Sequence, residues 1–123
     1  MASKLPAVIA GMTYNSSTSL DWEHQSPSSR RRILKSRPDL YIALVQWDAE
    51  FQLPNVDHHG GEELVYVVQG TFVDQHRTSG PGTLIRCEKG TSHRPSTPDG
   101  CTFIVMRDIT EEEKTRLVLK AKL

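Results

Sequence analysis

The chain has 123 residues, which is enough for one domain with a single hydrophobic core. Its 15 basic and 15 acidic side chains cancel. A neutral balance gives no electrostatic argument for binding to nucleic acid or to an anionic membrane, both of which require clustered positive charge, and the arginines at 30–32 are the one exception. No apolar stretch approaches the ~20 residues that span a bilayer, and the first residues do not have the pattern of an export signal.

Residues 1–39 show little regular pattern, and we expect them to form an N-terminal arm that packs on the folded domain or on a partner subunit. The three arginines at 30–32 lie beside serines and a proline, and we interpret them as a solvated loop face. The next segment, Leu40–Trp47, is continuous in apolar and β-forming residues. This composition predicts a strand that is covered on both faces.

The clearest predicted strand spans residues 64–69 and ends at Gly70. A second β-rich run follows at residues 71–76, so we expect these two segments to form a hairpin. Another turn at residues 79–82 leads into a predicted strand at residues 83–87.

The last predicted strand covers residues 101–107, and only the segment 109–123 looks helical. Thr110 and Glu113 have the spacing of a capping box, which marks the start of a helix. Many short strands, frequent turns and one terminal helix predict an all-β protein, either an antiparallel sandwich or a small barrel.

Cys87 and Cys101 are the two cysteines of the chain, and both fall in predicted strands. Because no export signal is recognisable, we predict that both thiols are reduced and that the protein is cytoplasmic.

Histidines, acids and glycines follow one another at two regular spacings in the middle of the chain. In the first series, three residues separate His59 from Glu63, and six separate Glu63 from Gly70. The second series consists of Gly82, Glu88, Gly90 and His93. These spacings resemble the two sequence motifs of the cupins, H-x-H-x(3,4)-E-x(6)-G and G-x(5)-P-x-G-x(2)-H-x(3)-N.

The resemblance implies a single-domain cupin, which is a double-stranded β-helix or jelly-roll barrel, over residues 40–108. The arm at 1–39 and the helix at 109–123 would flank this barrel. The chain departs from the motifs at three positions. These are Asp57 in place of the first histidine, Glu88 in place of the proline and Thr97 in place of the asparagine.

The cupin resemblance implies a metal site built from His59, Glu63 and His93. Alternate side chains of a strand share a face, so Asp57 points with His59 while His58 points away. Two imidazoles and one carboxylate suit iron(II), and they also bind zinc or manganese. A shift of one residue in strand register would bring His58 inward in place of His59.

Asp57 admits three interpretations. It is a fourth metal ligand through oxygen, or it accepts a hydrogen bond from a ligating histidine, or it leaves a coordination position open for water, oxygen or substrate. We favour Asp57 as one of the metal ligands or as a residue directly next to them. Some cupins have lost the metal and keep only the pocket.

Further segments resemble the cupin domains of zinc-binding anti-sigma factors and their stand-alone relatives. These segments are Trp22 and Glu23, residues 26–27, 31–34, 59–63, 82–83, 90–95 and 100–102. This subgroup includes iron-dependent enzymes that cleave diketones and hydroxylated acetophenones. The anti-sigma proteins also carry an N-terminal helical zinc domain, which has no counterpart here, so we expect an enzyme or small-molecule binder.

The function that the resemblance implies is that of a metal-dependent enzyme on a small enolisable or phenolic, polyketide-like molecule. An oxygenase-type reaction with iron(II) is the leading hypothesis, with Glu63, His59 and Asp57 as the catalytic residues. The alternatives are a zinc or metal-free cyclase, isomerase, decarboxylase or hydrolase, and a non-catalytic binding or sensing module. A homodimer is expected, because open sheet edges invite pairing.

Overall fold

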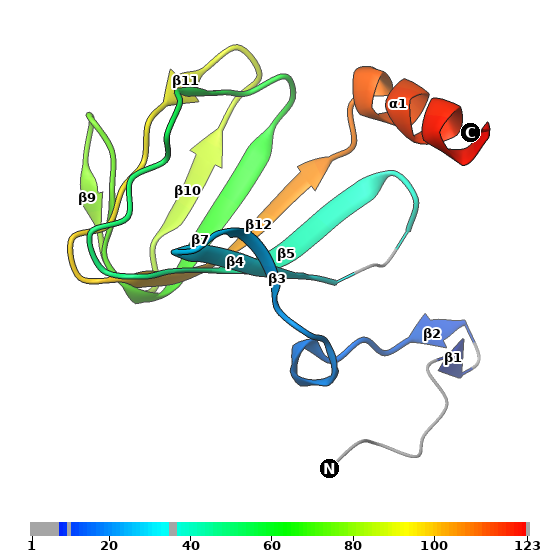
Figure 1. The fold of residues 1–123 in the computed structure, drawn as a ribbon, viewed down its shortest axis with the longest axis horizontal. Coiled ribbons are helices and arrows are strands. Elements are labelled where there is room, and N and C mark those ends of the chain that lie inside the picture. The colour runs from blue at the N-terminus through cyan, green and yellow to red at the C-terminus, as the bar shows by residue number, and fades with distance from the viewer. Residues whose placement is uncertain (1–7, 10, 35–36, 123) are drawn as a thin grey trace.

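One antiparallel sheet of six strands, in the order β10-β7-β12-β5-β4-β3, is the frame of the computed structural model (Figure 1). The structure describes residues 8–9, 11–34 and 37–122. The strands of the sheet are β3 (Glu23–Ser26), β4 (Ser29–Ile33), β5 (Leu40–Trp47), β7 (Glu63–Gly70), β10 (Leu84–Cys87) and β12 (Cys101–Asp108). The three long apolar strands β5, β7 and β12 lie side by side in the middle, and their alternate residues are buried on the inner face.

Short strands form a second layer over the inner face of this sheet (Figure 1). β6 (Asp57–His58) pairs with β11 (Ser92–His93), and β8 (Phe72–Val73) pairs with β9 (Thr78–Ser79). The two layers enclose the core, as in a jelly-roll barrel. The all-β architecture expected from the sequence is therefore confirmed.

Aromatic side chains from both layers meet in the core. Trp47 of the sheet stacks on Phe51 at 4.9 Å and on Phe72 at 5.7 Å between ring centroids. Phe103 meets Trp47 edge-on at 4.8 Å. These large rings fix the distance between the layers, and Phe72 also lies 6.0 Å from the His93 ring between centroids.

The two ends of the chain lie outside the barrel. β1 (Val8–Ile9) and β2 (Met12–Thr13) pair with each other away from the sheet, and the 3-10 turn η1 (Ser17–Ser19) follows them (Figure 1). The helix α1 (Glu111–Lys122) comes directly after β12.

The helix starts as the sequence predicts. The backbone N–H of Glu113 donates to Thr110 Oγ1 at 3.2 Å, and the backbone N–H of Thr110 donates to Glu113 Oε1 at 3.1 Å. These reciprocal bonds are the capping box, which is confirmed.

The hairpin expected between residues 64–69 and 71–76 is wrong. β7 pairs with β10 and β12, whereas β8 pairs with β9 in the other layer. The reason lies at Gly70, whose φ of 81° turns the chain out of the sheet. Its Cα lies against the Gly100 carbonyl, where any Cβ would come within 2.0 Å of the oxygen.

Part of the segment expected as an arm belongs to the sheet. Residues 23–26 and 29–33 form β3 and β4 at one edge, with β4 paired to β5. The arginines at 30–32, interpreted as a loop face, are therefore strand residues. Since neighbouring strand residues point to opposite faces, Arg31 points away from Arg30 and Arg32.

Candidate metal centre

His59 is buried at the start of the segment that joins β6 to β7, and only 7% of its surface is exposed. Its Nδ1 atom lies 2.9 Å from the Thr91 carbonyl oxygen. A carbonyl only accepts, so Nδ1 carries the proton and donates it. In the neutral imidazole Nε2 then carries the free lone pair, and this atom has no hydrogen-bond partner among the described residues.

His93, at the end of the neighbouring strand β11, is held in the same way. Its Nδ1–H donates to Asp74 Oδ2 at 3.0 Å, so in the neutral imidazole Nε2 carries the free lone pair. Burial opposes the ionisation of Asp74, but hydrogen bonds from His93 and from the backbone N–H groups of His76 and Arg77 outweigh it and lower its pKa. Asp74 is therefore an ionised acceptor at neutral pH, which is the usual partner of a metal-binding histidine.

Two carboxylates crowd the bare nitrogen of His59. Glu63 Oε2 lies 2.9 Å from His59 Nε2 but outside the direction of a hydrogen bond, and Asp57 Oδ2 lies at 3.4 Å. Asp57 Oδ2 is also 3.9 Å from His93 Nε2. Burial, followed by the charge of Asp57, raises the pKa of Glu63. Lone pairs that converge in this way repel one another unless a proton or a cation lies between them.

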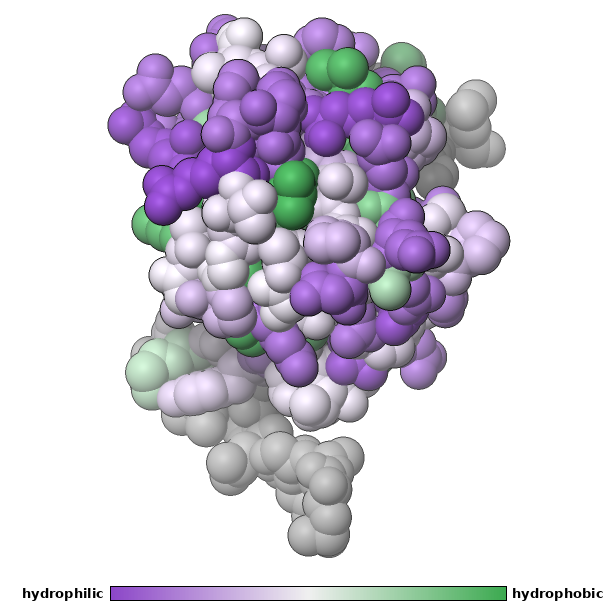
Figure 2. Space-filling view, turned by 90° about the vertical axis from the view of Figure 1, so that its left-hand side faces the viewer, coloured by the Kyte–Doolittle hydropathy of each residue, from purple (hydrophilic) through white to green (hydrophobic). Residues whose placement is uncertain are grey.

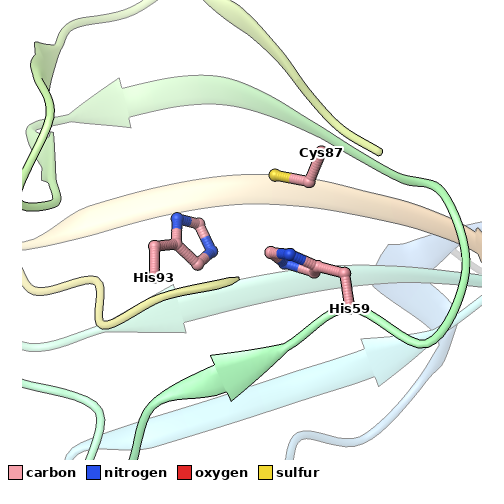
Figure 3. A group of neighbouring side chains, drawn as sticks. All are labelled: His59, Cys87 and His93. Atoms are coloured by element: carbon pink, nitrogen blue, oxygen red, sulfur yellow. The ribbon is translucent and has the colours of Figure 1, made fainter. Parts of the chain in front are cut away.

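Cys87 completes the cluster from the sheet. It ends β10 and pairs directly with Glu63 of β7, so both side chains lie on the inner face. Its Sγ atom and one nitrogen each of His59 and His93 lie within 4.8 Å of one another (Figure 3). Burial is the main cause that raises the pKa of Cys87 to about 11.

Two overlapping groups of donor atoms result, and both have the size of a metal site. One contains Asp57, His59 and Glu63, and the other contains His59, Cys87 and His93, with His59 common to both. The donor set fits a divalent cation, because each imidazole is anchored through Nδ1 and offers a bare nitrogen to the same space.

The structure places the four residues that the sequence predicts as ligands at one end of the barrel. Asp57, His59 and Glu63 cluster together, and His93 lies beside them on β11, where it is the direct cross-strand partner of Asp57. His58 is exposed and points away, so the register is the one in which His59 faces inward.

Cys87 and Asp74 are functional candidates that the sequence reasoning missed. Alternation along residues 84–87 would have placed Cys87 on the inner face, but its neighbour Glu63 follows only from the pairing of β10 with β7. Asp74 accepts hydrogen bonds from two backbone N–H groups in the turn before β9, which reads as an ordinary turn residue.

A cavity of about 340 Å³ opens beside the cluster, inside the barrel. Glu63 forms part of its wall, and Trp47, Phe51 and Phe103 line its apolar end. Of the cluster, Glu63 lines this space, which is large enough for a small aromatic molecule.

Together, the barrel and the inward imidazoles define a single-domain cupin with a short C-terminal helix. Residues 11–110 match the protein family described as the ChrR cupin-like domain, and the chain belongs to this family. No curated protein matches the chain in sequence.

Solved structures share the fold at low sequence identity. The anti-sigma factor ChrR, in its complex with SigE from Rhodobacter sphaeroides, is 22% identical with a TM-score of 0.67. The match covers 74% of this chain and 50% of the ChrR chain, so this chain spans about half the length of that relative. KdgF from Halomonas sp. is 22% identical with a TM-score of 0.68 and coverages of 81% and 96%. The polyketide cyclase RemF from Streptomyces resistomycificus is 21% identical with a TM-score of 0.66 and coverages of 83% and 89%.

Proposed function

We propose that this protein is a metal-dependent cupin enzyme that acts on a small enolisable or phenolic molecule. One observation carries the proposal: the Nε2 atoms of His59 and His93 converge near Glu63, and Glu63 lines a cavity with an apolar end. A catalytic metal needs ligands that are held in place and a pocket beside them for the substrate.

His59, His93 and Glu63 are the proposed ligands, and Asp57 is the proposed fourth oxygen donor or the general base. The side chain of Asp57 is 40% exposed, whereas those of the two histidines are almost fully buried. Asp57 is therefore the acid of the cluster that water and substrate reach most easily, as a general base must be reached. A divalent metal held there supplies Lewis acidity toward an enolate or phenolate oxygen, and iron(II) adds reactivity toward dioxygen.

The remaining contributions come from the chain itself. Trp47, Phe51 and Phe103 offer flat surfaces that hold an aromatic or polyketide-like body and exclude water from the reacting end. An oxygenase-type reaction comes first, because two imidazoles and one carboxylate with open positions are the set used by non-haem iron(II) oxygenases.

Cys87 favours a second candidate, a zinc enzyme with non-oxidative chemistry such as cyclisation, isomerisation, decarboxylation or hydrolysis. Its sulfur lies in one group with His59 and His93, and thiolate ligands favour zinc over hard cations. In this form, Glu63 and Asp57 remain available to move a proton.

Oxygen uptake and product analysis separate the candidates. The native chain, loaded with iron(II) or with zinc, is incubated with a β-diketone and with a hydroxyacetophenone. The first candidate predicts oxygen uptake with iron(II) only, and the second predicts product without oxygen uptake. His59→Ala should abolish either activity, while the exposed neighbour His58→Ala serves as the matched control. Ligand binding without turnover under any metal would assign the domain to the non-catalytic class.

We also propose a homodimer, built on the outer face of the sheet. On that face, Leu84 of β10 and Tyr66 of β7 are directly paired, and they are 62% and 45% exposed. Val68 and Met106 are further exposed apolar residues on the same face. The face at the β9 end is mostly hydrophilic instead (Figure 2). A second copy across the apolar face removes these side chains from water.

Sedimentation should give twice the chain mass for the native protein and the chain mass for Leu84→Glu.

A further inference from the structure

Arg31 is an arginine whose side chain is turned into the barrel. It lies in β4, at one wall of the cavity of about 340 Å³, with Ser29 beside it. One terminal N–H group donates to the Tyr41 hydroxyl and the other donates to Glu23, each at 2.9 Å. The Nε atom is buried and has no acceptor among the described residues. The two terminal N–H groups can therefore turn to an anion in the cavity, because their present partners lie at or near its surface.

Tyr41 and Arg107 continue the polar wall toward the proposed metal ligands. Arg107 of β12 pairs with Tyr41 of β5 on one side and with Glu63 of β7 on the other. Directly paired residues share a face, so Tyr41, Arg107 and Glu63 form one row across the inner face of the sheet. The guanidinium groups of Arg107 and Arg31 lie over the Tyr41 ring, at 4.5 Å and 5.8 Å from its centroid.

The charges around this wall favour an anion. Arg31 and Arg107 are the cations that line the cavity, and Glu63 is the acid that lines it. Glu23, which pairs with Arg31, is 58% exposed at the side chain and lies outside the lining, and Glu113 pairs with Arg107 from α1. Once Glu63 binds a metal, the positive charge of the two guanidinium groups dominates the cavity.

Arg32 shows why the position of Arg31 matters. Its Nε atom also lacks an acceptor among the described residues, but its guanidinium stacks over the Trp22 ring at 4.1 Å, outside the cavity. Arg31 combines an unpaired donor with a cavity that holds a ligand, and Arg32 does not.

The geometry points to a substrate that carries a carboxylate. Arg31 binds this carboxylate through its terminal N–H groups, and the Tyr41 hydroxyl lies next to it. The apolar body of the substrate extends over Trp47 and Phe103, and its reacting end reaches Glu63. Since two carboxylate oxygens match the planar fork of a guanidinium, Arg31 selects a carboxylate over a neutral group of equal shape. This inference rests on the proposed function for the reacting end, and on Arg31 alone for the anion.

Two ligands of the same shape test the inference, 2-naphthoate and its neutral counterpart 2-naphthamide. Calorimetric titration of the purified native chain should show naphthoate binding at least about tenfold more tightly than naphthamide, as expected for hydrogen bonds to a charged group. Arg31→Met should remove this preference and leave naphthamide binding unchanged. Arg30→Met is the matched control, because Arg30 lies on the opposite face and bonds to Gln46 and Asp48. Arg31→Lys keeps the charge without the fork and should retain part of the preference.

Three results would overturn the inference. The first is equal affinity for the two ligands, and the second is no binding of naphthoate. The third is a preference for naphthoate that survives Arg31→Met but is lost in His59→Ala, because the metal would then be the group that binds the carboxylate. Metal content measured on the same samples keeps the two proposals apart. If the protein contains no metal but still prefers naphthoate through Arg31, only the proposed metal-dependent function is contradicted. If the metal-loaded protein shows no preference, only the proposed carboxylate substrate is contradicted.

Discussion

Asp74 holds His93 in place through a hydrogen bond of 3.0 Å between His93 Nδ1 and Asp74 Oδ2. The other oxygen of the same carboxylate accepts from the backbone N–H groups of His76 and Arg77. Both oxygens of Asp74 are therefore occupied as acceptors, and the loop and the histidine are fixed by one side chain. This relationship makes Asp74 as important to the proposed metal site as a ligand.

Asp74→Asn should weaken metal binding about 10- to 100-fold, because an amide replaces one of the two acceptors with a donor. Competition with a chelator measures the change. Asp99→Asn is the control, since Asp99 accepts from Thr71 away from the cluster. Equal affinity in both variants would show that Asp74 does not position His93 for a metal.

Cys87 and Cys101 should both react slowly with iodoacetamide in the folded protein. Burial is the main cause that raises each pKa to about 11, so at pH 8 only about one thiol in a thousand is the reactive thiolate. The rates should rise steeply between pH 8 and the pKa and become fast on unfolding. Single serine variants assign the labelling to each cysteine. Reaction of Cys87 at the rate of free cysteine at pH 8 would contradict the buried placement.

The pattern of residues predicts the all-β fold and which side chains of the segment 57–59 face inward. Alternation in the segment 57–59 places Asp57 with His59, and the structure has His58 exposed and His59 buried. The segment Leu40–Trp47 is predicted as a strand and is β5 with the same bounds. Local periodicity and spacing are sufficient in these places, because they concern residues close together in the chain.

Partners that come from distant segments could not be predicted. Cys87 meets His59 only because β10 lies beside β7. Arg31 reads as one of three solvated arginines until β4 joins the sheet and turns it toward Tyr41. The prediction of a hairpin after Gly70 was wrong for the same reason, because Gly70 contacts Gly100, which lies thirty residues further along the chain.

Gly70→Ala should destabilise the protein far more than Gly82→Ala. Both glycines have positive φ, 81° and 87°, so both variants cost about 1 kcal/mol of backbone strain. At Gly70 the new Cβ would also lie 2.0 Å from the Gly100 oxygen, whereas at Gly82 nothing lies within 4 Å. We expect an additional loss of about 2 kcal/mol or more in the free energy of unfolding for Gly70→Ala. Equal losses in denaturant titrations would contradict the close approach.

Glu113 should stabilise the folded state in a pH-dependent way. Its hydrogen bond with Arg107 is the largest influence on its pKa, which is lowered from an ordinary value of 4.5. A lowered pKa means that the stabilisation is complete above pH 4.5 and is lost as the pH falls through the lower, folded value. Glu113→Gln should therefore lower the free energy of unfolding by about 1 kcal/mol at pH 7, with little difference at low pH. The exposed neighbour Glu112→Gln should have little effect at either pH.

Metal content tests the central claim most directly. Plasma mass spectrometry is applied to the native chain, purified without chelators or an affinity tag. It is also applied to the single variant His58→Ala and to the double variant that combines His59→Ala with His93→Ala. The proposed site predicts near-stoichiometric iron, zinc or manganese in the native chain and in His58→Ala, and its loss in the double variant. A native chain that contains no metal and takes up none on reconstitution, or a double variant that keeps its metal, would contradict the site.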